Sequence, residues 1–208
     1  MLPIMHPDRA KGWVRWQGCC CRTRWRSSPA ADKESGGAIA LAFASEGAKV
    51  VIADKNPATA TSTAAEVRAR GVAAAAVECD VTDIVDIRRC VDAAVGEFGR
   101  LDILVNNAMA DPGLSLIPFM ETTDAHMDNY WQSGPLATFH FMQVCYPHMR
   151  GHDSAIVNVG SRAGSTRPID RAGDCELDIG RTVVYLASEL SAFVTGHTVM
   201  VDGGSCRF

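Results

Sequence analysis

The sequence predicts an α/β protein built on one doubly wound parallel sheet. Short apolar runs rich in β-branched residues recur from residue 49 onward, and stretches long enough for a helix separate them. Glycines stand where three of these helices should end, at Gly47, Gly71 and Gly99. Strands that alternate with helices of this length form right-handed crossovers between parallel strands. The same alternation fixes the expected order of elements.

Each expected helix has a local signal for its start or end. Residues 35–46, "SGGAIALAFASE", are rich in Ala, with apolar residues at helical spacing. Pro57 favours the first turn of the second helix, and Thr82 or Asp83 can cap the third. The expected helices cover residues 35–46, 57–70, 84–98, about 122–149 and about 175–190. The expected strands cover residues 49–54, 72–80, 101–108, 154–161 and 197–204.

Composition and charge divide the chain near residue 34. A chain of 208 residues that is 47% hydrophobic can bury a sizeable core as one domain. Residues 1–34 form a basic segment rich in Trp and Cys without regular periodicity, and we expect a disordered leader there and a single domain over residues 35–208. A nucleic-acid-binding or mitochondrial-targeting arm is the alternative for the leader. Residues 12–18, "GWVRWQG", are too polar for a central strand, so no first strand is found before residue 35.

The sequence contains no apolar run long enough to span a membrane and no signal-peptide pattern, so a cytoplasmic protein with no membrane partner is expected. The eight cysteines match no zinc-ligand spacing and are interpreted as reduced thiols. We therefore assign no metal, and no nucleic-acid partner is expected for the domain.

Polar residues end the predicted strands, at the sheet edge where ligands bind in such folds. They are Asp54, Asp80, Asn106, Asn107 and Ser161. A carboxylate at Asp54 can accept hydrogen bonds from the adenosine ribose and repel a 2′-phosphate, which favours NAD over NADP. The adjacent cation weakens that preference, and Asp54 could instead start the turn before the next helix. Asp80, which can contact adenine, could likewise serve as a helix cap.

Five ordered segments resemble the landmarks of the short-chain dehydrogenase/reductase family: "GGAIALAFASEGAKVVIAD", "CDVTD", "LDILVNNA", "IVNVGSRAG" and "DIGRTVVYLASELSAFVTGHTVMVDGG". The resemblance implies a Rossmann-like fold and an NAD(P)-dependent oxidoreductase acting on a small-molecule alcohol or carbonyl substrate. It also implies a homo-oligomer. Implied cofactor-binding residues are Gly36, Gly37, Asp54, Asp80, Val81, Asn106, Asn107 and Ala108, and Ser161 matches the serine that polarises the substrate carbonyl.

The catalytic Tyr-x-x-x-Lys of that family is absent here. Every lysine lies before residue 56, and the residues between Gly164 and Arg171 are too few for the family's tyrosine helix, sixth strand and substrate lid. We therefore expect a deletion near residues 165–171 and an incomplete sheet without its first and sixth strands. Trp131 takes the place of the family's catalytic asparagine, and Tyr185 is expected in the core. The predicted function is an impaired oxidoreductase; the alternative is an inactive family member that binds nucleotide or a full-length relative, or fails to fold.

Overall fold

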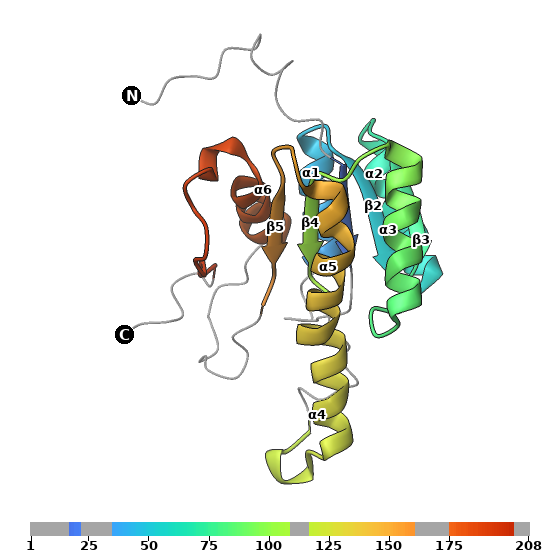
Figure 1. The fold of residues 1–208 in the computed structure, drawn as a ribbon, viewed down its shortest axis with the longest axis vertical. Helices are drawn as coiled ribbons and strands as arrows, with labels where there is room; N and C mark the ends of the chain where they lie inside the picture. The colour runs from blue at the N-terminus through green and yellow to red at the C-terminus, as the bar shows by residue number, and fades with distance from the viewer. Residues whose placement is uncertain (1–16, 22–34, 109–116, 161–174, 202–208) are drawn as a thin grey trace.

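The protein forms one parallel sheet covered by helices on both faces (Figure 1). The computed structural model describes residues 17–21, 35–108, 117–160 and 175–201. All four strand pairs are parallel, and the strand order is β3-β2-β1-β4-β5. The strands are β1 Gln17–Cys21, β2 Lys49–Asp54, β3 Ala74–Glu78, β4 Ile103–Asn106 and β5 Ala155–Asn158. The predicted doubly wound, Rossmann-like sheet is confirmed.

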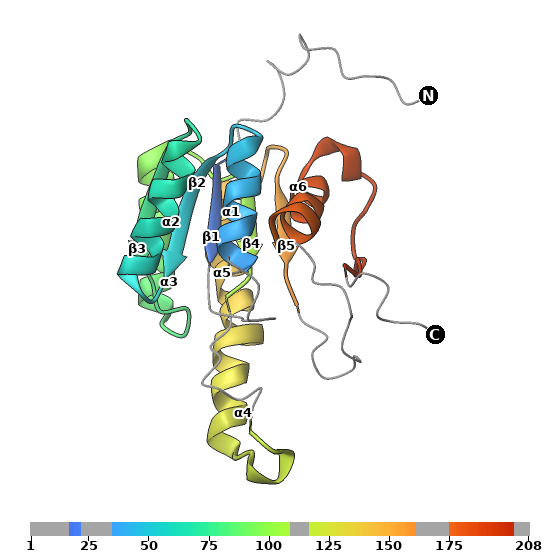
Figure 2. The same ribbon diagram turned by 180° about the vertical axis from the view of Figure 1, so that it is seen from behind.

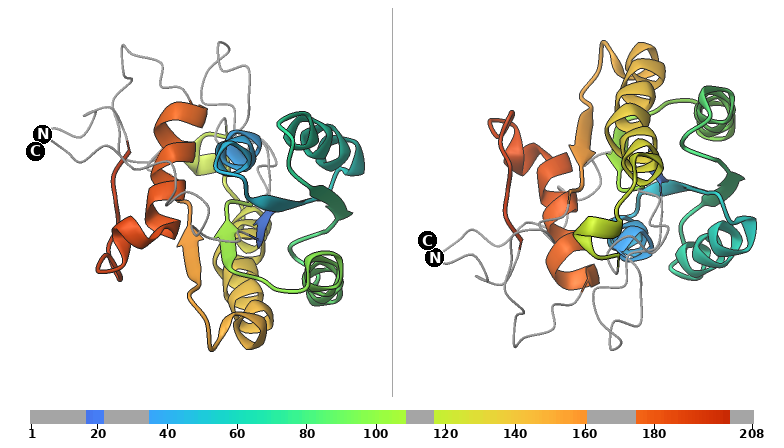
Figure 3. Two further views of the ribbon diagram at one scale, coloured as in Figure 1. Left: turned by 90° about the horizontal axis from the view of Figure 1, so that it is seen from above. Right: turned by 90° about the horizontal axis from the view of Figure 1, so that it is seen from below.

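The helices lie in two layers. Helices α1, α2 and α6 cover one face of the sheet, and α3 and α5 cover the other (Figures 2 and 3). The α-helices are α1 Ser35–Ser45, α2 Pro57–Ala69, α3 Ile84–Phe98, α4 Asp124–Trp131, α5 Ala137–Met149 and α6 Arg181–Ala187. The π-helices are η3 Gln132–Leu136 and η4 Cys175–Gly180, and the 3₁₀ helices are η2 Phe119–Glu121 and η5 Glu189–Ser191. Because η3 joins α4 to α5, residues 124–149 form one long helical region, as the sequence predicts.

A central first strand corrects the expectation that this strand is missing. Strand β1 pairs with β2 on one side and with β4 on the other. The polar run at residues 12–18 misleads, because the strand begins only at Gln17 and includes only the last two residues of that run. Strands β2 and β4 would each leave buried backbone groups unpaired without β1, and this demand outweighs a weak local pattern.

The expected last strand is also corrected. The described part of the 197–204 segment, residues 197–201, is not in a strand. A strand needs a neighbour to pair with, and β5 is the last strand in the described sheet order. Consistent with this, Val199, Met200 and Val201 are exposed. The described residues contain no sixth strand, and residues 161–174 lie outside them.

Two apolar clusters hold the layers together. The first includes Ile39, Leu41, Ile52 and Val67 and joins the sheet to α1, α2 and α6. The second includes Ile87, Val91, Leu104 and Phe141 and joins the sheet to α3 and α5. Each sheet face is thus buried by helices, as expected for a parallel sheet.

Candidate functional site

The strand register brings the predicted polar residues to one edge of the sheet. Asn106 ends β4 beside Cys21 of β1, and Asn158 of β5 lies on its other side. Asp54 ends β2 beside Glu78 of β3. Because the strands are parallel, all of these ends lie at the carboxyl edge, where ligands bind in doubly wound sheets.

Asp54 adopts the turn role that the sequence left open. Its side chain is buried, and its Oδ1 accepts a hydrogen bond from the backbone N–H of Asn56 at 2.8 Å. Asn56 in turn caps α2, because its Oδ1 accepts from Ala58 N at 3.0 Å. The β2–α2 turn therefore fixes the Asp54 carboxylate at the sheet edge by local hydrogen bonds.

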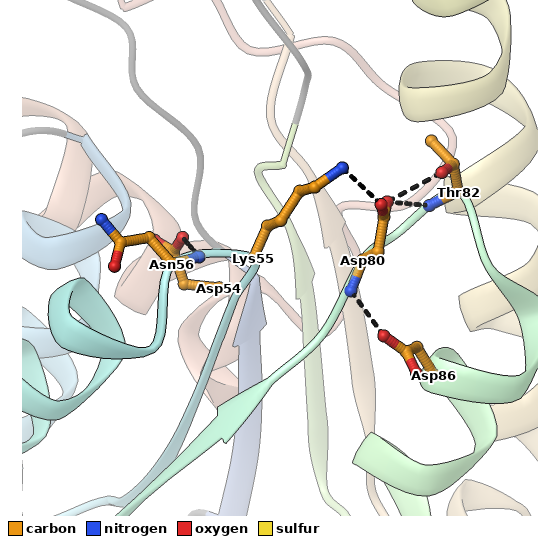
Figure 4. A network of polar contacts seen from close by, with 6 residues as sticks. All are labelled: Asp54, Lys55, Asn56, Asp80, Thr82 and Asp86. Atoms are coloured by element: carbon orange, nitrogen blue, oxygen red, sulfur yellow. Dashed lines mark hydrogen bonds and ion pairs between the residues drawn. The ribbon is translucent and has the colours of Figure 1, made fainter.

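Asp80 connects the ends of β2 and β3. Its Oδ2 accepts from Lys55 Nζ at 2.5 Å, and its Oδ1 accepts from the Thr82 hydroxyl at 2.7 Å and from Thr82 N at 3.0 Å (Figure 4). The backbone N–H of Asp80 donates to Asp86 Oδ2 on α3 at 3.0 Å. The N-cap of α3 is Asp83, whose side chain accepts from Val85 N. Asp80 is thus one member of a polar network rather than the cap of α3.

The charge state of Asp80 follows from that network. Burial acts to raise the pKa of its carboxyl group, but hydrogen bonds from Lys55 and Thr82 and the positive charge of Lys55 lower it more. The net result is a pKa below the ordinary value, so Asp80 is an anion at neutral pH. The neighbouring Val81 is buried against the α3 side of the sheet.

The asparagine pair after β4 lies beside the start of α1. Asn106 Nδ2 donates to Asn158 Oδ1 at 2.8 Å, and Ser35 Oγ donates to Asn107 Oδ1 at 3.2 Å. Asn107 Nδ2 is buried without a hydrogen-bond partner among the described residues. Buried amide donors in folded proteins are usually hydrogen-bonded, so this amide is suited to donate to a bound acceptor. Ala108 follows and packs against the second apolar cluster.

The first turn of α1 can supply further donors. Gly36 and Gly37 are buried there, and without side chains they allow an anion to approach the backbone amides of the helix. The backbone amides of the first turn of α1 and the Asn107 side chain supply hydrogen-bond donors at one part of the sheet edge. The carboxylates of Asp54 and Asp80 supply hydrogen-bond acceptors at another part. A dinucleotide presents anionic phosphates and hydroxyl donors, so the described residues fit such a cofactor.

The catalytic side of the site is less complete. Ser161 lies outside the described residues. Tyr146 is followed four residues later by Arg150, the spacing of the absent Tyr-x-x-x-Lys with another cation. This pair is at the end of α5, which leads to the amino end of β5, so it lies at the opposite edge from the polar strand ends. Tyr185 on α6 is 40% exposed, so the expectation of a core residue is wrong. Helix α6 instead buries Val183, and Val184 and Leu186 also pack on the first cluster, leaving Tyr185 toward solvent.

Two contacts at this edge escape the sequence analysis. Asn158 pairs with Asn106 only because β5 lies next to β4, and Ser35 reaches Asn107 across 72 residues of sequence. Asn158 is the one polar residue within the apolar run 155–159, and this was the only local signal available. In the part of the chain that the structure describes, no three His, Cys, Asp or Glu side chains are grouped as metal ligands, and no helix has the length and apolar character to cross a membrane.

The sheet and its polar carboxyl edge define a Rossmann-like α/β protein, and the comparisons give its family. The chain belongs to the short-chain dehydrogenase/reductase family: residues 31–172 match the family described as short chain dehydrogenase. Residues 162–205 match the description enoyl-(acyl carrier protein) reductase. This is a family of oxidoreductases, and the resemblance found in the sequence is confirmed.

Curated relatives include three dehydrogenases that this chain covers to different extents. A 12α-hydroxysteroid dehydrogenase from a Clostridium species is 27% identical over 239 residues, covering 83% of this chain and 92% of the relative. Sorbitol dehydrogenase from Cereibacter sphaeroides is 40% identical over 131 residues, covering 62% of this chain. The chain spans only 49% of that relative, and 44% of the L-fucose dehydrogenase from Oryctolagus cuniculus.

Solved structures show the same fold. A 7α-hydroxysteroid dehydrogenase, solved in complex with NADH and 7-oxo glycochenodeoxycholic acid, superimposes with a TM-score of 0.78 at 22% identity, covering 97% of this chain and 98% of that one. A short-chain dehydrogenase/reductase from Burkholderia xenovorans gives a TM-score of 0.77 at 24% identity, with 91% and 96% coverage.

Proposed function

We propose that this chain is an NAD-binding oxidoreductase of the short-chain dehydrogenase/reductase type whose turnover is impaired. The observation that carries the proposal is the convergence of Asp54, Asp80 and Asn107 on the carboxyl edge of the sheet, beside the first turn of α1. In this proposal the α1 amides and Asn107 hold the phosphates, Asp54 accepts from the ribose hydroxyls, and Asp80 and Val81 contact the adenine. The bound nicotinamide would supply hydride chemistry on an alcohol or carbonyl substrate.

The charges at the end of β2 favour NAD over NADP. Asp54 would repel the 2′-phosphate of NADP, whereas the adjacent Lys55 would attract it. Lys55 Nζ is bound to Asp80 Oδ2, and this ion pair offsets its charge. The balance at the ribose position is therefore negative, which supports NAD as the preferred cofactor.

Turnover is impaired in this proposal because the proton-transfer groups of the family are absent. Ser161 can still donate a hydrogen bond to a developing alkoxide, but no Tyr-x-x-x-Lys exists to move the proton. The match of 239 residues to the Clostridium relative exceeds the 208 residues of this chain, so that relative has residues with no counterpart here. This supports an internal deletion, which we place near residues 165–171.

An inactive nucleotide-binding protein is the second candidate function. The observation that favours it is the position of the lysines, none of which follows residue 55. In this case the chain would bind nucleotide, or a full-length relative, without oxidising or reducing a substrate. Both candidates share the cofactor site, so nucleotide binding and turnover must be measured separately.

The cofactor site is tested by thermal unfolding with NADH and with NADPH. At a hundred times its dissociation constant a ligand adds about 2.7 kcal/mol to the stability of the native state, which raises Tm by about 5–10 °C in a domain of this size. We expect a larger rise with NADH than with NADPH, and Asp54→Ala should reduce this difference. Asp92→Asn on the exposed face of α3 is the control. A Tm that neither NADH nor NADPH changes would overturn the proposal.

Turnover then separates the two candidate functions. Polyol and hydroxysteroid substrates are suitable probes, because the relatives are named for such compounds. Slow oxidation of NADH, or reduction of NAD, that is lost in Ser161→Ala supports the impaired enzyme. Binding of NADH without any turnover supports the inactive form.

We also propose that the chain forms a homodimer through α4 and α5. Met127, Trp131, Phe139 and Tyr146 are large, exposed apolar residues at spacings that place them on one side of the long helical region. Asp124 and Asp128 begin this region, and Arg150 ends it. An antiparallel pairing about a two-fold axis would bury the apolar residues of both copies and place opposite charges together.

Sedimentation velocity tests the dimer. Phe139→Asp places a charge near the middle of the proposed interface and should shift the protein to monomer. Val85→Asp, at another exposed apolar position on α3, should leave the association unchanged. A monomer at all concentrations in the unmodified protein would contradict the proposal.

The proposed compartment is the cytoplasm. Cys79, Cys90 and Cys145 are buried cysteines that form no disulfide, and a reducing compartment maintains such thiols.

A further inference from the structure

Two buried cysteines lie in the same apolar cluster at the end of β3. Cys79 is the first residue after the strand, and Cys90 lies in the middle of α3. Cys79 is 1% exposed and Cys90 is fully buried, both belong to the second apolar cluster, and contact with Cys90 is the leading cause that raises the pKa of the Cys79 thiol. Neither residue belongs to the proposed cofactor site, so the pair has no role in the function argued above.

Hydrogen bonds on both sides of the pair hold the two backbone segments in place. Asp80 N donates to Asp86 Oδ2 at 3.0 Å, and Arg89 Nη2 donates to Glu78 O at 3.0 Å. Cys79 N itself donates to Asp54 O at 3.1 Å. The residues before and after Cys79 are thus connected to the same stretch of α3 that carries Cys90. The segments that carry the two sulfur atoms are therefore held side by side.

We infer that Cys79 and Cys90 are a redox-sensitive dithiol that closes to a disulfide and links the turn carrying Asp80 to α3. With hydrogen peroxide as oxidant, the two thiols and one peroxide yield one disulfide and two molecules of water. One S–S bond forms, two S–H bonds and the O–O bond break, and the two sulfurs are oxidised while the peroxide oxygens are reduced. This inference goes beyond the proposed function and does not depend on it.

The reaction should be slow in the native protein. Contact with Cys90 and burial raise the pKa of the Cys79 thiol, so the reactive thiolate is scarce at neutral pH. Peroxide must also enter a closed core, which requires a local opening between β3 and α3. We therefore expect oxidation over hours rather than seconds, at a rate that rises with pH.

Peptide mapping provides a direct readout. Trypsin can cut after Arg88 and Arg89, so Cys79 lies in the peptide 71–88 and Cys90 in the peptide 90–100. The folded protein is treated with hydrogen peroxide, quenched with catalase, unfolded in the presence of an alkylating reagent and then digested. We expect the two peptides to appear joined, with a mass lower by two hydrogens than their sum, and to separate on reduction with dithiothreitol.

Thermal unfolding gives a second, independent readout. A disulfide that closes this short loop should raise Tm by about 5–10 °C, reversibly with dithiothreitol. Cys90→Ala should lose both the joined peptide and the rise in Tm, whereas Cys145→Ala, at another buried thiol of the same cluster, should retain both. Recovery of Cys79 and Cys90 as separately alkylated or separately oxidised peptides in the unmodified protein would overturn the inference, whether or not the variants fold.

Discussion

At the residue scale, Asp80 makes stability depend on pH. Its pKa is lowered in the folded protein, so its contribution to stability is fully present above the unfolded pKa of about 3.9 and is lost as pH falls through the lower folded value. Because this carboxyl group is partly exposed, solvent reduces the size of the effect.

We expect Asp80→Asn to lower Tm at pH 7, and the difference from the unmodified protein to shrink as pH falls below about 4, because the unfolded state then binds a proton at Asp80 more readily than the native state does. Melts recorded from pH 3 to pH 7 measure this. Asp92→Asn should show no such convergence. A difference of constant size across the whole range would show that Asp80 does not act through its charge.

The position of a site residue could be predicted from the sequence where a local pattern marks the end of a strand. Asp54, Asp80 and Asn106 each end an apolar run, so their place at the sheet edge follows from the sequence. The hydrogen-bond partners of the site residues could not be predicted from the sequence. The contacts of Lys55 with Asp80 and of Ser35 with Asn107 join turns that are distant in sequence, and only the strand order brings them together.

At the element scale, the end of α3 depends on a left-handed glycine. Gly99 has φ of 84°, and its N–H donates to Val95 O at 2.7 Å. A Cβ built at Gly99 meets nothing within 4 Å, so the cost of Gly99→Ala comes from the backbone alone. We expect this change to destabilise the protein by about 1–2 kcal/mol.

Gly96 is the matched control within the same helix. It also has open space around a built Cβ, but its φ is in the ordinary helical range. Gly96→Ala should therefore stabilise the protein by about 0.5–1 kcal/mol. Urea unfolding of both variants measures the two changes, and equal effects at the two positions would contradict the backbone explanation.

Elements with complete local signals were predicted within a few residues. Strand β2 has the predicted bounds, and Pro57 and Gly71 frame α2 as expected. The failures concern strands whose existence depends on a neighbour. Strand β1 forms because β2 and β4 flank it, whereas the apolar residues 197–201 form no strand because no described strand is next to them.

At the scale of the whole molecule, the first strand places the start of the folded domain before residue 35. A chain that lacks residues 1–34 loses the strand between β2 and β4, so we expect it to show no cooperative unfolding transition. A chain that lacks only residues 1–10 keeps β1 and should unfold cooperatively. Circular dichroism melts compare the two. A cooperative melt from residues 35–208 alone would instead support a domain boundary at residue 34.

The sheet is covered unevenly near β5. Val157 packs with the α1 and α6 layer, so the adjacent Ile156 points to the α5 side, where it is 40% exposed. The described helices therefore leave one face of the last strand partly open. We expect this partly open face to be a weak part of the fold.

The position of β1 in the sheet also determines when the protein can fold during its synthesis. Residues 17–21 leave the ribosome well before their partners, which are residues 49–53 and 103–106. Residues up to 106 must be translated before the central strand has both neighbours, and such distant pairings close slowly. The growing chain thus carries an unpaired strand during this interval. We expect chaperones that bind nascent chains to influence the yield of this protein more than the stability of its finished fold does.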